Sequence, residues 1–166
     1  MDATTPNAHA PAEPVVTTAT AAKPDPLTRF LAFFIDAVIV AVVGLVPIIG
    51  GLVGVAYILL RDGLNYDFMD GRSIGKKIMK LRPVRLDGGP MDMETSVRRN
   101  WPLAFGSLGQ ALVYVPIIGW VLIPIVGLVG LVLVIIEIVK VLTDAEARRW
   151  GDGMAGTKVV AVSDAG

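Results

Sequence analysis

The sequence has almost none of the side chains that build redox or metal centres. Its 166 residues include no cysteine and a single histidine, His9. Without cysteine the chain has neither disulfides nor thiolate chemistry, and one histidine cannot form the imidazole clusters that hold transition metals. We therefore expect no metal, no cofactor and no conventional enzymatic centre.

Charge is also scarce. Only 18% of the residues are charged, and 15 basic residues balance 15 acidic ones. Disordered chains are rich in charge and nucleic-acid-binding domains are usually basic, so this composition argues against both. Hydrophobic residues make up 54% of the chain and the mean hydropathy is +0.65. These values indicate a membrane protein whose partner is the lipid bilayer, with no nucleic acid bound.

The amino-terminal segment differs from the rest of the chain. Residues 1–26 contain seven alanines, five threonines and five prolines. Such a segment cannot form a packed core, and it lacks the apolar stretch of a signal peptide. We predict a disordered tail over residues 1–26, followed by a membrane domain over residues 27–162.

Two long stretches carry no charge: residues 37–60, with 24 residues, and residues 100–136, with 37. A membrane helix needs about 20 residues. As one helix the longer stretch would measure about 55 Å, far more than a hydrocarbon core of about 30 Å, so it must fold back. The string Val-Pro-Ile-Ile-Gly at residues 115–119 supplies a turning point, and it recurs at residues 46–50.

The sequence therefore predicts an all-α integral membrane protein built from two transmembrane helical hairpins. The short return limb of the first hairpin leaves an alternative, in which one tilted helix over residues 37–60 reduces the count to three. The four helices are expected at about residues 29–46, 48–64, 101–118 and 120–142, with a cytoplasmic loop over 65–100 and a cytoplasmic carboxy-terminal segment over 143–162.

The basic residues favour four helices over three. Nine of them lie between Arg61 and Arg99, and four more lie from Lys140 onward. Basic loops stay in the cytoplasm, and only an even number of helices keeps both groups there together with the amino terminus. We expect a multi-pass protein of the cell inner (cytoplasmic) membrane, with both termini in the cytoplasm.

The central loop is expected to contain its own small elements. Apolar residues recur at helical spacing over residues 73–81, which predicts an amphipathic helix in the headgroup region. Residues 84–86 alternate and lead into an Asp-Gly-Gly-Pro turn, and residues 157–162 read as a second strand, so we predict a two-stranded β ribbon. The lysines expected to face anionic lipid headgroups are Lys76, Lys77 and Lys80.

Asp36 is the strongest candidate for a functional residue. It lies seven residues beyond Arg29, about 10 Å along a helix and on the same face. An ionised carboxylate inside a bilayer costs about 2.5 to 3.5 kcal/mol, so Asp36 must face the bundle and find a cation or a proton. Arg98 or Arg99 could reach it from the cytoplasmic face as a structural ion pair. The alternative interpretation is that Asp36 binds a proton or a cation as part of the protein's function.

A second acidic residue, Glu137, lies near the end of the last apolar run. Lys140 follows three residues later on the same helical face. We expect these two side chains to form an ion pair that acts as a clasp at the membrane interface.

Three segments carry charged and small residues in a distinctive order. They are Arg29-Phe-Leu-Ala-Phe-Phe-Ile-Asp36, Gly71-Arg-Ser-Ile-Gly-Lys-Lys77 and Asp152-Gly-Met-Ala-Gly-Thr-Lys-Val-Val160. Together they resemble the RDD family of small bacterial membrane proteins, with serine in place of threonine in the Gly-x-Thr-x-Gly-Lys segment. The resemblance covers about residues 27–162.

The resemblance implies that Arg29, Asp36 and Asp152 are the arginine and the two aspartates that name the family. Family members are largely uncharacterised; transport of unknown ligands is suggested, and cation/proton antiport is proposed for some. One hypothesis is therefore a small, oligomeric transporter with Asp36 as the proton or cation site and Arg29 tuning it. The alternative is a non-catalytic membrane scaffold or assembly partner, in which these residues are structural and Asp152 caps a helix or pairs with loop lysines.

Overall fold

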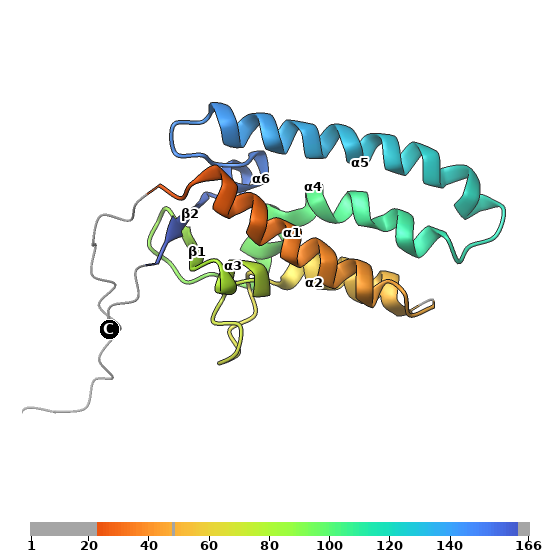
Figure 1. The fold of residues 1–166 in the computed structure, drawn as a ribbon, viewed down its shortest axis with the longest axis horizontal. Coiled ribbons are helices and arrows are strands. Elements are labelled where there is room, and N and C mark those ends of the chain that lie inside the picture. Colours follow the sequence, from red (N-terminus) through yellow and green to blue (C-terminus); the bar gives the residue numbers. More distant parts are fainter. Residues whose placement is uncertain (1–22, 48, 163–166) are drawn as a thin grey trace, which may run out of the picture.

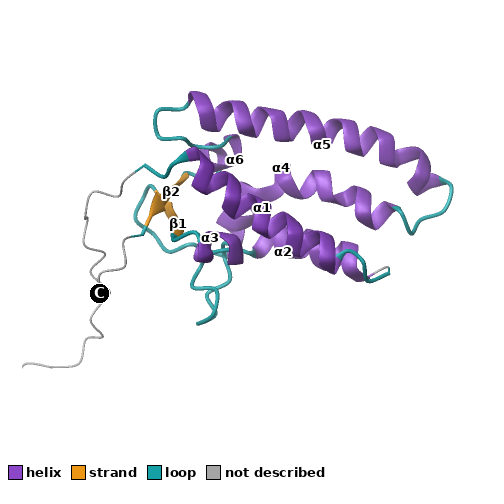
Figure 2. Cartoon of the chain, viewed as in Figure 1, coloured by secondary structure: helices purple, strands orange, loops and turns teal. Residues whose placement is uncertain are grey.

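The computed structural model describes residues 23–47 and 49–162. Most of the tail predicted over residues 1–26 thus lies outside the described residues. The fold is mostly helical, with a small two-stranded sheet (Figures 1 and 2). In chain order the elements are α1 (Pro26–Val43), α2 (Ile49–Leu60), α3 (Ile74–Ile78), β1 (Leu81–Arg85), α4 (Met93–Leu112), α5 (Ile118–Thr143), α6 (Trp150–Met154) and β2 (Thr157–Ala161).

The four longer helices run alongside one another, with α4 in the middle. Helix α4 packs against α2 and against α5, and α1 packs against α2. Figure 1 shows α3, α6 and the β ribbon gathered at one end of this bundle, which we call the capped end. Both Val-Pro-Ile-Ile-Gly strings lie where one helix stops and the next begins, because proline and glycine interrupt the helical hydrogen bonds.

Within the described residues, two helices are long and apolar enough to cross a membrane, α1 with 18 residues and α5 with 26. Helix α2 is apolar but has 12 residues, which span about 18 Å. Helix α4 begins at Met93, not near residue 101 as expected. The Asp92 side chain accepts a hydrogen bond from the Thr95 amide at 2.7 Å, and this cap starts the helix two turns before the uncharged stretch.

The predicted pairing of the two strands is confirmed. Strands β1 and β2 are antiparallel, with Leu81 opposite Ala161 and Arg85 opposite Thr157. A lone two-stranded ribbon is marginally stable in water. Here Leu81 and Val159 form a buried cluster with Ala32 of α1, so the ribbon is held against the first helix.

Helix α3 is shorter than the helix expected over residues 73–81. It begins after Ser73, whose hydroxyl accepts a hydrogen bond from the Lys76 amide at 3.3 Å. It ends at Ile78, and Lys80 has a φ of 53°, a left-handed conformation that turns the chain into β1. Five residues cannot form an amphipathic surface helix, and α3 instead packs against α1.

Candidate functional site

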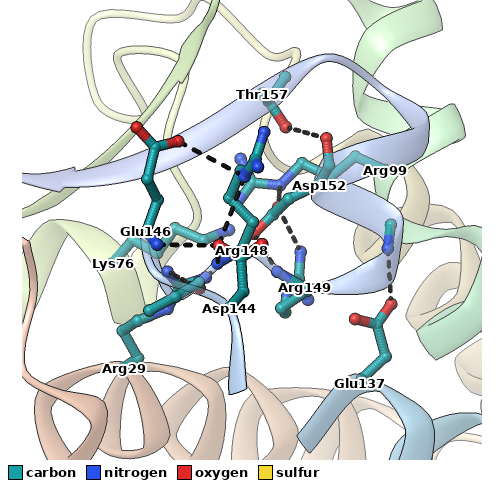
Figure 3. Close-up of polar contacts among 12 residues, drawn as sticks. Arg29, Lys76, Arg99, Glu137, Asp144, Glu146, Arg148, Arg149, Asp152 and Thr157 are labelled. Atoms are coloured by element: carbon teal, nitrogen blue, oxygen red, sulfur yellow. Dashed lines mark hydrogen bonds and ion pairs between the residues drawn. The ribbon is translucent and has the colours of Figure 1, made fainter. Parts of the chain in front are cut away.

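A cluster of charged side chains lies at the capped end, between the long helices and the small elements that cover them. Figure 3 shows part of it. Such a cluster is unusual because charges are costly to bury unless they are paired. In the described part of the chain, the members of this charge cluster are Arg29, Asp36, Arg61, Asp62, Lys76, Arg99, Glu137, Arg149 and Asp152.

Asp36 is buried, with 1% of its surface exposed, and it accepts hydrogen bonds on both carboxylate oxygens. Its Oδ2 accepts from Arg61 Nη1 at 2.9 Å. Its Oδ1 accepts from the Tyr57 hydroxyl at 2.9 Å and from the Gly75 amide at 2.8 Å. The carboxylate therefore joins α1 to the end of α2 and to the start of α3.

The prediction that Arg98 or Arg99 pairs with Asp36 is wrong. Arg98 lies on the outer face of α4 with 65% of its side chain exposed, and it pairs with Glu94 at 2.8 Å. Arg99 is fully buried but turns toward Asp152. Arg61 takes their place because it directly follows α2, the helix that packs beside α1. From the sequence alone, Arg61 is predicted only to be one of the basic residues that set the membrane orientation.

Asp152 is fully buried and is surrounded by three arginines, one on α1, one on α4 and one at the N-cap of α6 (Figure 3). Its Oδ1 lies 2.8 Å from Arg99 Nε of α4 and 3.5 Å from Arg149 Nη2. Its Oδ2 lies 3.0 Å from Arg29 Nη2 of α1 and also accepts from the backbone amide of Arg149 at 3.0 Å. Asp152 thus caps α6, as one hypothesis held, and pairs with arginines where lysines of the loop had been expected.

Arg29 extends this contact to the loop before α6. Its Nη1 donates to the Ala147 carbonyl at 2.7 Å, while its Nη2 holds Asp152. Arg29 and Asp152, which were both predicted from the sequence to be site residues, are therefore in contact although 123 positions separate them in the chain. Asp36 belongs to a separate ion pair of the same cluster.

Asp62 is a member of the cluster that sequence reasoning missed. Its carboxylate accepts from Lys76 Nζ at 2.5 and 2.7 Å and from Asn100 Nδ2 at 3.0 Å. Lys76 is 7% exposed, so the expectation that it faces lipid headgroups was wrong. The signal available in the sequence was its position, because Asp62 lies two residues beyond the uncharged stretch that Asp36 directly precedes.

The other two lysines of that prediction lie nearer the surface. The Lys77 ammonium lies 4.8 Å from the centre of the Phe68 ring and donates to the Phe68 carbonyl. Lys80 is exposed at the turn into β1. Both are outside the charge cluster.

Glu137 does not form the expected clasp with Lys140. Its Oε1 accepts from the Gly151 amide at 3.1 Å, and only 3% of the residue is exposed. This contact mirrors the one between Asp36 and Gly75, because in both a carboxylate on a long helix binds the amide of a glycine in a short helix. A Cβ at Gly75 would lie 2.0 Å from the Ala32 carbonyl oxygen, and one at Gly151 would lie 2.0 Å from that of Arg99. Only glycine allows either approach.

The carboxylates of the capped end make the fold sensitive to acid. Burial by itself would raise the pKa of Asp62 and Asp152, but Lys76 beside the first and Arg99 beside the second hold both pKa values below the ordinary 3.8. A carboxylate whose pKa is lower in the folded state than in the unfolded state stabilises the fold at every pH above its unfolded pKa. This stability is lost as the pH falls from the unfolded pKa toward the folded one.

We therefore expect the melting temperature of the purified protein to stay level from about pH 7 to pH 5 and to drop below about pH 4. A melting series across this range measures it. The drop should be smaller in Asp152→Asn, which removes one of the two groups. An equally steep drop in that variant would show that Asp152 does not contribute.

Two apolar helices long enough to cross a membrane, and the hydrophobic side chains exposed along them, indicate a helical membrane protein. The chain belongs to the RDD family, whose family model matches residues 51–156. No curated protein and no solved structure matches it. The matched residues include Asp152 but not α1, so the place of Arg29 and Asp36 in this site rests on the contacts described above.

Proposed function

We propose that the protein crosses the inner membrane four times, with α1, α2, α4 and α5 in the bilayer and the capped end in the cytoplasm. The distribution of charge supports this arrangement. The basic residues of the loop and of the last segment lie at or near the capped end, while the turns at the other end carry no charge. Membrane proteins keep their lysines and arginines on the cytoplasmic side.

The outer surfaces of the helices support a lipid environment. Large apolar side chains are exposed along α1 and α5, among them Val42 at 60%, Val121 at 65% and Leu128 at 64%. Contiguous apolar surface of this kind is rare on a soluble monomer and ordinary against lipid. Helix α2 is short for a full bilayer, so we propose that the chain after it completes the crossing or that the bilayer thins around it.

Within this membrane protein, we propose that Arg29, Asp36 and Asp152 are structural and that the protein is a non-catalytic scaffold or assembly partner. The observation that carries this proposal is the saturation of Asp36. A carboxylate that carries protons or cations must exchange partners during each cycle. Asp36 has donors on both oxygens and a guanidinium at 2.9 Å, so its charge is already balanced.

The second candidate is a transporter with Asp36 as the cation or proton site. The observation in its favour is that Asp36 lines a cavity of about 470 Å³ between the helices. Against it, Arg29 binds Asp152 and cannot tune Asp36 directly. The cavity wall is also rich in cationic side chains, which repel a cation.

The two candidates predict different results for Asp36→Asn. We expect neither the wild type nor the variant to move protons in response to a sodium or potassium gradient in proteoliposomes that contain a pH dye. We also expect a lower melting temperature for the variant, because it leaves Arg61 buried without its carboxylate.

Asp87→Asn is the matched control, since Asp87 is 59% exposed and lies outside the cluster. Proton movement in the wild type and in Asp87→Asn that disappears in Asp36→Asn would overturn the scaffold proposal and establish the transporter. Correct insertion of all three proteins is checked first.

A further inference from the structure

A long groove runs between α1 and α5, with α4 as its floor. Two cavities of about 470 Å³ each form it, one near the capped end and one farther along the bundle. They are continuous because the same side chains line both. These shared residues are Phe33, Asp36, Arg61, Leu103 and Val134. We call this feature the α1–α5 groove.

The capped end of the groove is strongly cationic. Of the described residues that line the cavity there, two carry carboxylates, Asp36 and Glu137. Asp62 and Asp152 lie behind the wall, so the whole charge cluster holds five cations and four carboxylates. Every cation has a carboxylate within ion-pair distance, but Asp152 is shared by three arginines, so the cluster carries one net positive charge. A buried charge that is not balanced is destabilising. The five cations that line the wall are Arg29, Arg61, Lys76, Arg99 and Arg149.

Arg99 is the group that lacks acceptors. It is fully buried, and its Nε lies near Asp152 at 2.8 Å and Asp62 at 3.7 Å. Although Nε lies within ion-pair distance of Asp152, none of the three guanidinium nitrogens, Nε, Nη1 and Nη2, makes a hydrogen bond to the described residues. A guanidinium carries five N–H donors, and buried donors left unpaired cost free energy. Arg99 lines the groove and pairs with Asp152 through its Nε, but the donors of its buried guanidinium have no acceptors in good geometry.

Beyond the capped end the groove is mainly apolar, with Ser107 and Gln110 on its floor, and it has the length of one lipid leaflet. Its floor runs from Arg99 to Gln110 of α4, which is about 16 Å of helix. Half of a hydrocarbon core measures about 15 Å. The walls along this length are mainly aliphatic and aromatic side chains of α1 and α5, such as Phe33, Val40 and Leu131.

We propose that the α1–α5 groove binds one anionic phospholipid, with its phosphate held by Arg99 and an acyl chain lying along the apolar part. Phosphate oxygens match the paired donors of a guanidinium, and their charge balances the one net positive charge of the cluster. A free anion would satisfy Arg99 but would leave the apolar length of the groove unfilled. This assignment does not depend on the choice between scaffold and transporter, because it uses Arg99 and the groove wall and not the exchange of a proton at Asp36.

The test compares lipids on the purified full chain after its lipid has been removed with detergent. We expect phosphatidylglycerol to raise the melting temperature and to remain bound as one molecule per chain in native mass spectrometry. Phosphatidylcholine of the same chain length should do neither, because its choline ammonium cancels the charge of its phosphate and would lie beside the cationic wall. Inorganic phosphate alone should not reproduce the shift.

A blocked groove separates this site from general lipid effects. Gly127 lines the apolar part, and a Cβ there meets nothing within 4 Å, so Gly127→Leu fills the groove without touching the charge cluster. Gly109→Leu is the matched control, since Gly109 also has open space and does not line either cavity. We expect Gly127→Leu to weaken phosphatidylglycerol binding at least tenfold and Gly109→Leu to leave it unchanged.

Several outcomes would overturn the proposal. Equal binding of the two lipids would show that the net charge of the headgroup does not matter and would overturn the assignment of an anionic lipid. Equal loss in both leucine variants would remove the role of the groove. An equal shift with inorganic phosphate would identify a free anion as the ligand. A change of oligomeric state in Gly127→Leu, without a change in lipid binding, would make the groove a contact between copies of the chain.

Discussion

Asp152→Asn is expected to destabilise the protein by about 3 to 5 kcal/mol, the usual effect of removing one partner of a buried ion pair. The substitution keeps the size of the side chain and removes its charge. Arg99, which is fully buried, then loses its closest carboxylate, and Arg29 and Arg149 lose theirs. For a chain of this size such a loss lowers the melting temperature by about 10 °C.

Thermal unfolding of the purified protein measures this effect, with Asp70→Asn as the control. Asp70 also pairs with two arginines, but 45% of its side chain is exposed, and exposed pairs contribute at most about 1 kcal/mol. Its φ of 50° suits asparagine as well as aspartate. Equal stability of the two variants would contradict the central role of Asp152.

A double-mutant cycle identifies which helix Asp152 holds. Arg29→Gln removes the partner on α1 and leaves Arg99 and Arg149 in place. If Asp152 fastens α6 to α1, the two substitutions together destabilise less than the sum of their separate effects. Simple additivity would mean that the contact at 3.0 Å carries no coupling and that Arg99 alone holds the carboxylate.

The residues of the site could be found from the sequence, but their partners could not. Asp36 could be identified because a carboxylate beside a long apolar stretch is costly to place in a membrane unless it has a partner. Its partner Arg61 lies 25 positions away, and that pairing depends on how α1 and α2 pack. No local pattern records such packing. The β ribbon was predictable because alternation and a turn are local signals.

Lys76 shows how a correct local pattern can mislead. Its spacing from the apolar residues of the loop placed it on the polar face of a helix, and polar faces usually meet water or headgroups. In the structure Lys76 binds Asp62, which also accepts a hydrogen bond from Asn100, because α3 packs inward against α1 through Gly75. Gly75 can be found in the sequence, but the sequence does not show that it packs against the carbonyl of Ala32.

Gly151→Ala is expected to be at least as damaging as Asp152→Asn, although it adds a single methyl group. The new Cβ would lie 2.0 Å from the carbonyl oxygen of Arg99, which is fixed within α4. Helix α6 must then move away and lose the hydrogen bond between the Gly151 amide and Glu137. Asp152, the next residue, is pulled from its arginines, so we expect a loss of about 4 kcal/mol or more.

Gly153→Ala tests whether this effect comes from the contact or from the helix. Gly153 lies in the same short helix, and a Cβ there meets nothing within 4 Å. Alanine favours helix over glycine by about 1 kcal/mol, so this control should melt at the same temperature as the wild type or slightly higher. A similar loss in both variants would show that α6 tolerates no change of backbone freedom, and the close approach to Arg99 would not be the cause.

Combining Gly151→Ala with Asp152→Asn then decides how the capped end is built. If α6 docks as one unit, the alanine already breaks the ion pairs that asparagine removes, and the double variant should be little worse than Gly151→Ala alone. Full additivity would mean that Asp152 keeps its arginines while α6 is displaced. Non-additive effects would mean that the charge cluster depends on the contact between Gly151 and the carbonyl of Arg99. Asp152 can lie among its three arginines only if the backbone of α6 approaches α4 as closely as that contact allows.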